Sequence, residues 1–161
     1  MRLSITSSSP EETRDLGEAL GQLAKPGDVF LLSGELGSGK TQFTKGIAIA
    51  LGVERPVTSP TFNLVYEYQG AQVNRVTLRH FDLYRLEYEE QLDDIDYFGL
   101  LEGEAVSVVE WGDKFPEALP MDYLLVEFEF RDENTRVLRF EAAGSRSEKL
   151  LNALKELSGV H

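Results

Sequence analysis

The segment from Gly34 to Thr41 carries the strongest chemical signal in the sequence. It contains Gly, four residues of any type, Gly-Lys and then Thr, which is the pattern of a phosphate-binding loop. A chain of this composition produces roughly 0.005 such matches by accident, so chance is a poor explanation. A plain glycine turn that caps a helix is the alternative. The pattern predicts a loop that binds a nucleoside triphosphate.

Each residue type in this segment has a physical part in binding phosphate. Glycines adopt backbone conformations closed to other residues, so successive N–H groups can converge on phosphate oxygens at a helix N-terminus. The ammonium of Lys40 can reach the β- and γ-phosphates, and the hydroxyl of Thr41 can ligate Mg²⁺. The residues expected to contact the nucleotide here are Glu35, Leu36, Gly37, Ser38, Gly39, Lys40 and Thr41.

A triphosphate site also needs a carboxylate opposite the loop, either to hold Mg²⁺ or to position an attacking water. Glu110 ends the apolar run from Val106 to Val109, and Asp82 follows His80 and Phe81 at the end of another candidate strand. Open α/β sheets place their ligands at the C-terminal ends of strands, so both carboxylates are candidates. For either one, an exposed carboxylate or a helix cap is the alternative.

Thr61 lies in the segment Thr58 to Phe62, where nucleotide-binding proteins often carry a sensor of the γ-phosphate. A simple proline turn explains the same residues equally well.

The chain has no Asn-Lys-x-Asp segment of the kind that reads guanine, which favours adenine as the base. No obvious arginine finger lies near the motifs, so we expect slow hydrolysis by the isolated chain.

The aromatic and basic neighbours of the two carboxylates each allow more than one interpretation. Trp111 is the only tryptophan, a residue type found in cores more often than against ligands, but it directly follows Glu110. We expect His80 to be structural. Tyr84 and Arg85 either contact a partner or substrate or close a turn.

Composition limits the partners of the chain. Its 161 residues include 28 Asp plus Glu and 16 Lys plus Arg, a formal net charge of −12. A free-standing nucleic-acid binder is therefore not expected, although Arg75, Arg79 and Arg85 could form a local basic patch. The absence of cysteine excludes disulfides and thiol chemistry. No signal peptide or membrane span is evident, so we expect a cytoplasmic protein without membrane contact.

Two apolar runs, Val29 to Leu32 and Ala105 to Val109, predict strands buried on both faces, as in parallel sheets covered by helices. Period-two alternation predicts a hairpin of Phe62 to Tyr68 with Val73 to Phe81. Further strands are predicted around Leu3 to Ile5, Leu124 to Phe130 and Arg136 to Ala142. The sequence therefore predicts a mixed α/β sheet flanked by helices, with antiparallel strands, in a single domain spanning residues 1–161.

Helices are expected at four places between these strands. One starts after Ser9 and ends before Lys25, and a second runs from Lys40 to Leu51. The acidic segment from Glu87 to Gly99 predicts one or two short helical pieces on the surface. Ser145 and Glu148 have the spacing of a capping box at the start of a final helix. Its apolar stripe would be Leu150, Leu151, Leu154 and Leu157.

Four segments taken together resemble the TsaE family of small bacterial ATPases, also called YjeE. They are Gly34 to Thr41, Ser59 to Phe62, His80-Phe81-Asp82-Leu83-Tyr84-Arg85-Leu86, and Val109-Glu110-Trp111. The resemblance covers about two-thirds of the chain. It implies a P-loop ATPase that supports formation of N6-threonylcarbamoyladenosine in tRNA. It also implies binding to the TsaB and TsaD proteins, with tRNA reached indirectly through that complex.

The resemblance also implies roles for individual residues. It assigns Lys40 to the phosphates, Thr41 and Glu110 to Mg²⁺, and Asp82 to catalysis through water. Thr61 would report the γ-phosphate, and Trp111 would support the ATP site. Which carboxylate holds the metal and which acts on water is left open. Two other functions are also left open: a small-molecule kinase, in which Asp82 deprotonates an acceptor hydroxyl, and a nucleotide-switched binding module with negligible hydrolysis.

Overall fold

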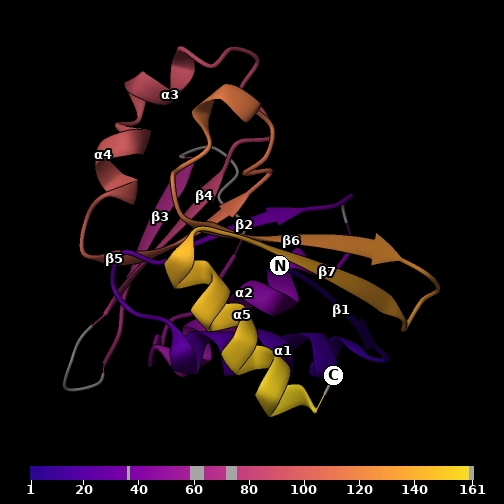
Figure 1. The fold of residues 1–161 in the computed structure, drawn as a ribbon. Helices are drawn as coiled ribbons and strands as arrows, with labels where there is room; N and C mark the ends of the chain where they lie inside the picture. Colours follow the sequence, from indigo (N-terminus) through magenta and orange to yellow (C-terminus); the bar gives the residue numbers. More distant parts are fainter. Residues whose placement is uncertain (36, 59–63, 72–75, 160–161) are drawn as a thin grey trace.

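The computed structural model describes residues 1–35, 37–58, 64–71 and 76–159, and within them seven strands form one mixed sheet (Figure 1). The strands are β1 (Arg2–Ser7), β2 (Val29–Ser33), β3 (Val65–Gln69), β4 (Thr77–Asp82), β5 (Ala105–Glu110), β6 (Tyr123–Phe130) and β7 (Arg136–Ala143). Their order is β1-β7-β6-β2-β5-β4-β3. The four central strands β6, β2, β5 and β4 are parallel, whereas β3 and β7 run antiparallel to their neighbours. The predicted mixed α/β sheet is confirmed.

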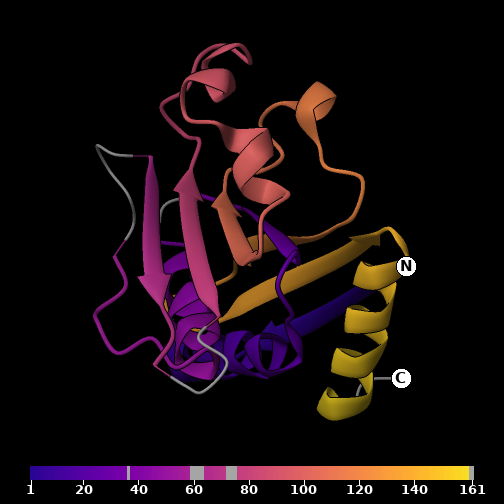
Figure 2. The same cartoon turned by 90° about the vertical axis from the view of Figure 1, so that its left-hand side faces the viewer.

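Helices cover both faces of the sheet and enclose two apolar cores. On one face lie α1 (Pro10–Leu23), α2 (Lys40–Ala50) and α5 (Ser145–Ser158), and on the other lie α3 (Gln91–Asp94), α4 (Tyr97–Leu101) and one 3₁₀ turn (Pro116–Ala118). Seen from the side, α5 stands at the β1 end of the sheet, away from β3 and β4 (Figure 2). No helix in the described ranges has both the length and the apolar character needed to cross a membrane.

The strand register brings the two candidate carboxylates to one edge of the sheet. Every residue of β5 is buried, as expected for a central strand with helices on both faces. In its ladders, Glu110 pairs with Leu32 of β2 on one side and with Asp82 of β4 on the other. Three parallel strands therefore end together, and the loop after β2 opens beside both carboxylates.

The helix that follows this loop is held by unusually close contact between two backbones. A Cβ on Gly17 of α1 would lie 2.1 Å from the carbonyl oxygen of Phe43, and one on Gly46 of α2 would lie 2.0 Å from that of Arg14. Only glycine permits this approach. The start of α1 is fixed by Ser9, whose side chain accepts from the N–H of Glu12, as the sequence predicted. The contact with α1 thus fixes the position of α2.

The capping box predicted for the last helix is wrong. Gly144, not Ser145, occupies the cap position of α5, and it makes no side-chain cap bond. The carboxylate of Asp122 replaces it and accepts from the N–H groups of Arg146 at 2.9 Å and Ser147 at 3.0 Å. A residue more than twenty positions away in the sequence supplies the cap, so local spacing could not reveal it. The apolar stripe is also shorter than predicted, because Leu157 is 64% exposed.

The acidic segment after β4 forms the two short helices that the sequence predicted, α3 and α4. Their position differs from the expected surface location, because Leu92 and Tyr97 are fully buried in the second apolar core. Phe81 of β4 packs edge-to-face on Tyr97, with ring centroids 5.4 Å apart. Burial raises the pKa of the Tyr97 hydroxyl. The side chains of α3 and α4 are therefore part of the second apolar core, and the two helices cover this face of the sheet.

Gly17→Ala should destabilise the protein by about 1–3 kcal/mol, because the added methyl group meets the Phe43 carbonyl, which cannot move without displacing α2. This strain should outweigh the roughly 1 kcal/mol by which alanine favours a helix over glycine. Denaturant unfolding measures the change. Asp15→Ala, on the exposed side of α1, is the control and should change stability by no more than about 0.5 kcal/mol. Equal stabilities for the two variants would contradict this account of the packing.

Candidate active site

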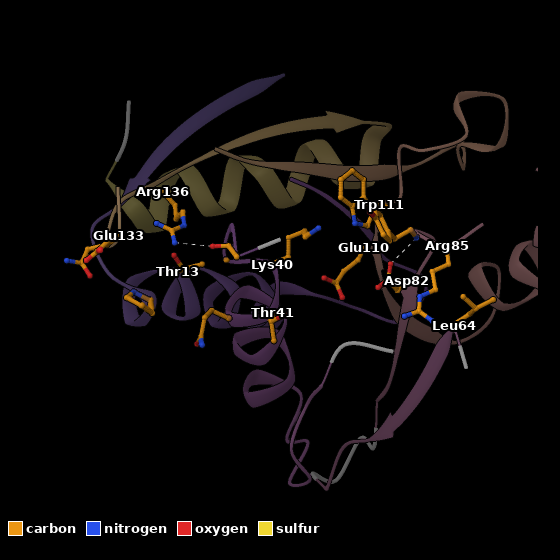
Figure 3. Close-up of a pocket in the computed structure, with 16 residues that line it drawn as sticks. Thr13, Lys40, Thr41, Leu64, Asp82, Arg85, Glu110, Trp111, Glu133 and Arg136 are labelled. Carbon is orange, nitrogen blue, oxygen red and sulfur yellow. Dashed lines mark hydrogen bonds between the residues drawn. The ribbon is translucent and has the colours of Figure 1, made fainter. Parts of the chain in front are cut away.

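A cavity of about 500 Å³ opens at the edge where β2, β4 and β5 end. Figure 3 shows Lys40 near its centre, with Asp82, Glu110 and Trp111 at one end and Thr13, Glu133 and Arg136 at the other. The residues that line it are Pro10, Thr13, Gly37, Gly39, Lys40, Thr41, Gln42, Leu64, Asp82, Tyr84, Arg85, Glu110, Trp111, Glu133, Asn134 and Arg136. Seven of them were singled out as site residues in the sequence: Gly37, Gly39, Lys40, Thr41, Asp82, Glu110 and Trp111.

The loop between β2 and α2 uses its glycines for the reason that the sequence suggested. Gly34, Gly37 and Gly39 have φ angles of 145°, 78° and 109°, a region that disfavours other residues. At Gly34 there is also no space, since a Cβ would lie 2.8 Å from the carbonyl oxygen of Phe128. Gly39 is the residue that leads directly into α2. The loop is therefore bent tightly over the first turn of that helix.

The first turn of α2 offers hydrogen-bond donors toward an anion. No side chain caps this helix, and its first turn contains no acidic residue. The hydroxyl of Ser38 is buried and has no hydrogen-bond partner among the residues that the structure describes. An uncapped N-terminus carries unsatisfied N–H groups and a partial positive charge. Thr41 lies in the same turn and lines the cavity.

Three further nucleotide contacts are predicted from the sequence: Glu35, Leu36 and Thr61. Glu35 is exposed on the loop. Leu36 and Thr61 lie outside the described residues, so the structure provides no test of them.

Lys40 places a buried ammonium in the middle of the cavity. The residue is 5% exposed, and its Nζ donates to the carbonyl oxygen of Gly34 at 2.5 Å. The same atom lies 4.3 Å from the centre of the Trp111 ring, a cation–π distance. Burial lowers the pKa of Lys40, whereas the charges of Glu110, Asp82 and Asp113 act in the opposite direction. These surroundings hold the ammonium at a defined point facing the carboxylates.

The two carboxylates sit side by side but in different environments. Glu110 is 4% exposed, and its Oε2 lies 2.8 Å from Nε2 of the fully buried His80. Asp82 is half-buried, and its Oδ1 accepts from the N–H of Tyr84 at 3.0 Å. Burial raises the pKa of Asp82, and the charge of Glu110 adds to this, whereas the Tyr84 N–H and the Lys40 ammonium act against it. The pair thus divides into a buried, hydrogen-bonded carboxylate and a more accessible one.

Trp111 takes its position through a rare backbone conformation. Its φ is 59°, and its N–H donates to the carbonyl oxygen of Leu32 at 2.7 Å. The indole packs against the ring of Tyr84, with centroids 5.3 Å apart. A left-handed tryptophan is strained and persists only where its surroundings impose it. Here the turn places the indole against Lys40.

Sequence reasoning missed the wall formed by α1 and the β6–β7 turn. Arg136, the first residue of β7, donates to the carbonyl oxygen of Gly37 at 3.0 Å and stacks 4.6 Å from the centre of the Phe130 ring. Thr13 and Glu133 lie at the same end of the cavity as Arg136, and Pro10 and Asn134 also line the cavity. Gly37 and Arg136 are 99 positions apart, so only the strand order, with β7 beside β6 and β6 beside β2, could have indicated the contact.

The expectation of slow hydrolysis relied on the absence of an obvious arginine finger near the motifs in the sequence. Arg136 and Arg85 both line the cavity. Of the three arginines of the possible basic patch, Arg79 and Arg85 are among the described residues. Arg79 is paired with Glu67 at 2.8 Å and donates to the carbonyl oxygen of Leu100, and Arg75 lies outside the described residues.

Comparison with known proteins places this fold and site in a family. Residues 7–138 match the family model described as threonylcarbamoyl adenosine biosynthesis protein TsaE. The tRNA threonylcarbamoyladenosine biosynthesis protein TsaE of Bacillus subtilis is 41% identical over 153 residues, 94% of this chain and 93% of that protein. The protein of the same name from Aquifex aeolicus is 42% identical over 137 residues, 84% of this chain and 92% of that protein. The crystal structure of Bacillus subtilis YdiB has a TM-score of 0.81 at 35% identity and covers 98% of this chain.

The fold and site define an α/β protein in which a glycine-rich strand-to-helix loop opens a ligand cavity at the edge of a mixed sheet. The chain belongs to the TsaE family, which takes part in tRNA threonylcarbamoyladenosine biosynthesis. The resemblance read from the sequence motifs is confirmed.

Asp82→Asn should raise the thermal midpoint at neutral pH, and this gain should disappear in acid. Because burial raises the folded-state pKa above the ordinary 3.8, the ionised carboxylate destabilises the fold at every pH above that raised value. Below about pH 3.8 both folded and unfolded states are protonated, and the difference vanishes. Melting curves across this range measure the effect. Asp15→Asn, which is exposed, is the control and should follow the parent protein throughout. A constant difference at every pH would contradict the assignment.

Proposed function

We propose that the chain binds ATP with Mg²⁺ and hydrolyses it in support of tRNA threonylcarbamoyladenosine formation, acting with TsaB and TsaD. The observation that carries this proposal is the buried ammonium of Lys40, which faces Asp82 and Glu110 across the cavity. A buried positive charge between a helix N-terminus and two carboxylates suits a ligand that brings both phosphate and a divalent cation. The membership in the TsaE family supports the biological setting.

The residues of the loop fit a triphosphate. The bend at Gly37 and Gly39 allows backbone N–H groups to point toward one centre, and Ser38 contributes a buried hydroxyl without a partner in the described chain. Lys40 supplies the compensating charge, and its present acceptor is only a neutral carbonyl oxygen of Gly34. A phosphate oxygen would be a stronger acceptor for the same ammonium.

The donor set also fits Mg²⁺, which prefers oxygen ligands and keeps several waters. Thr41 and Glu110 would hold the ion, since both line the cavity beside Lys40. Within the described ranges, no three or more His, Cys, Asp or Glu side chains converge as a self-sufficient metal site. This agrees with an ion held mainly by phosphate oxygens and water. When bound, Mg²⁺ would offset the negative charge of the β- and γ-phosphates.

The environments of the two carboxylates suggest a different role in hydrolysis for each. Glu110 is buried and hydrogen-bonded to His80, which suits a fixed ligand. Asp82 is the more accessible, and burial has raised the pKa of its carboxyl toward the range in which a group can accept a proton from water. We therefore assign Glu110 to the metal and Asp82 to the attacking water. Arg85, which lines the same end, lies where it could meet the charge on the transferred phosphate.

The opposite wall would receive the rest of the nucleotide. Thr13 of α1 lies with Glu133 and Arg136 at the end of the cavity away from the carboxylates (Figure 3). Trp111 lies at the carboxylate end against Lys40, so its part is to support the phosphate site. The acidic total of the chain supports a division of labour in which TsaB and TsaD make most of the contact with tRNA.

Lys40→Ala should abolish ATP binding, because it removes the only buried ammonium that lines the cavity in the described chain. Isothermal titration calorimetry with Mg²⁺ present measures the affinity. Lys45→Ala is the matched control, since Lys45 lies on the same helix but outside the cavity lining, and its affinity should equal that of the parent. If Lys40→Ala bound ATP as tightly as the parent, the proposed site would be refuted.

Asp82→Asn and Glu110→Gln should each slow phosphate release by about 10²-fold or more, with a smaller effect on ATP affinity. The assay follows inorganic phosphate with TsaB and TsaD present. Asp113→Asn is the control, since Asp113 is close enough to act on the charge of Lys40 but is not part of the cavity wall, and its turnover should stay near that of the parent. Phosphate on an organic acceptor would favour the kinase instead. Nucleotide-dependent association with TsaB and TsaD, without phosphate release, would favour the binding module.

A further inference from the structure

We propose that His80 is a positioning residue that donates an N–H to Glu110 and holds its carboxylate in the orientation in which it serves Mg²⁺. The inference rests on the proposed function and deepens it. It replaces the expectation from sequence that His80 has only a structural role. The observations that carry it are the strand register, the burial of both side chains and the hydrogen bond between them.

The register explains how the two side chains meet. His80 pairs with Val108 and Asp82 pairs with Glu110 in the parallel ladder of β4 and β5. Residues two apart on a strand share a face, so His80, Asp82 and Glu110 all project toward the side of the sheet that α2 covers. The imidazole therefore reaches along the face to the last residue of the neighbouring strand, and Nε2 lies 2.8 Å from Oε2 of Glu110.

Burial makes this contact rigid. The side chain of His80 is 0% exposed and that of Glu110 only 6% exposed. An imidazole enclosed by the core cannot turn freely, whereas a glutamate with three rotatable bonds would otherwise have several orientations. The fixed partner is thus the histidine, and the group it restrains is the carboxylate at the cavity wall.

The tautomer follows from the donor and acceptor types. An ionised carboxylate only accepts hydrogen bonds, so Nε2 of His80 must carry the proton that it donates to Glu110. The other ring nitrogen, Nδ1, has no partner among the residues that the structure describes. An N–H at that buried position would be left without an acceptor, so the tautomer with the proton on Nε2 alone fits the surroundings.

A histidine that only fills the core would not need a hydrogen bond to the Glu110 carboxylate. Partners that orient a ligand of a metal fix its direction, and their removal typically weakens metal affinity by about 10–100-fold. If His80 acts in this way, its loss should raise the Mg²⁺ requirement and leave metal-free contacts of the nucleotide with the loop largely intact. A core-filling role would lower the stability without that selectivity.

The deciding experiment compares two amides at position 80. The side-chain nitrogen of His80→Gln can reach about as far as Nε2, whereas that of His80→Asn ends near the position of Nδ1 and cannot reach Glu110. MgCl₂ is titrated into each protein with ATP present, and the fluorescence of Trp111, the only tryptophan, reports binding. We expect the Mg²⁺ concentration at half-maximal binding to rise at least about tenfold in His80→Asn. In His80→Gln it should stay close to that of the parent.

Combining each variant with Glu110→Ala tests whether the histidine acts through the glutamate. In that background, Gln and Asn at position 80 should give the same Mg²⁺ dependence, because the group that they orient is gone. If His80→Asn, His80→Gln and the parent all needed the same Mg²⁺ concentration with Glu110 intact, the inference about His80 would be overturned, but the proposed function would stand. A parent chain that binds no ATP at any Mg²⁺ concentration would overturn the proposed function and this inference together.

A second measurement needs neither nucleotide nor a variant at position 80. Nitrogen-15 NMR of the ligand-free parent distinguishes the two tautomers of His80, and the signal can be assigned because the chain has only two histidines. We expect the proton on Nε2, and we expect the resonance to change in Glu110→Ala. A proton on Nδ1, or a spectrum indifferent to Glu110→Ala, would overturn the proposal even if His80→Asn fails to fold.

Discussion

The burial of one positive charge constrains this end of the molecule more than any other interaction. An ammonium removed from water is strongly destabilising unless hydrogen bonds and opposite charges surround it. Lys40 finds the carbonyl oxygen of Gly34, the face of Trp111 and the charges of Glu110 and Asp82. The carbonyl oxygen of Gly34 is positioned by the bend of the loop, and the indole of Trp111 by a left-handed backbone conformation. The parts of the cavity therefore depend on one another.

The close packing of α1 on α2 gives this arrangement its precision. Lys40 and Thr41 stand in the first turn of α2, so any shift of that helix would move both. Gly17 and Gly46 allow the backbones of α1 and α2 to come into direct contact. This contact fixes the position of α2 against α1. The N-terminus of α1 in turn reaches the cavity through Pro10 and Thr13. One rigid pair of helices thus sets the positions of both Lys40 and the opposite wall of the cavity.

The sequence revealed those features that depend on neighbouring residues or on simple periodicity. The buried strands β2 and β5, the cap at Ser9 and the positive φ angles of the glycines before Lys40 each reflect local chemistry, and the structure bears them out. Contacts between distant segments were not accessible in this way. Asp122 caps α5 only because β6 begins beside the end of β7, where that helix starts, and Arg136 donates to Gly37 only because of the strand order. The cap at Ser145 failed for the same reason, since a spacing rule cannot exclude a better acceptor elsewhere in the chain.

The acidity of the chain has a consequence for how an anionic ligand would be captured. With a net charge of −12, the protein as a whole repels a nucleoside triphosphate, and steering by a broad positive field is not available. At physiological salt, however, such repulsion is screened beyond about 8 Å, whereas contacts inside the cavity are screened much less. The attraction of Lys40 and the N-terminus of α2 then acts only after the ligand has entered. Specific capture must therefore depend on the fit within the cavity, and this makes the exact placement of Lys40, Glu110 and His80 more important than the overall charge.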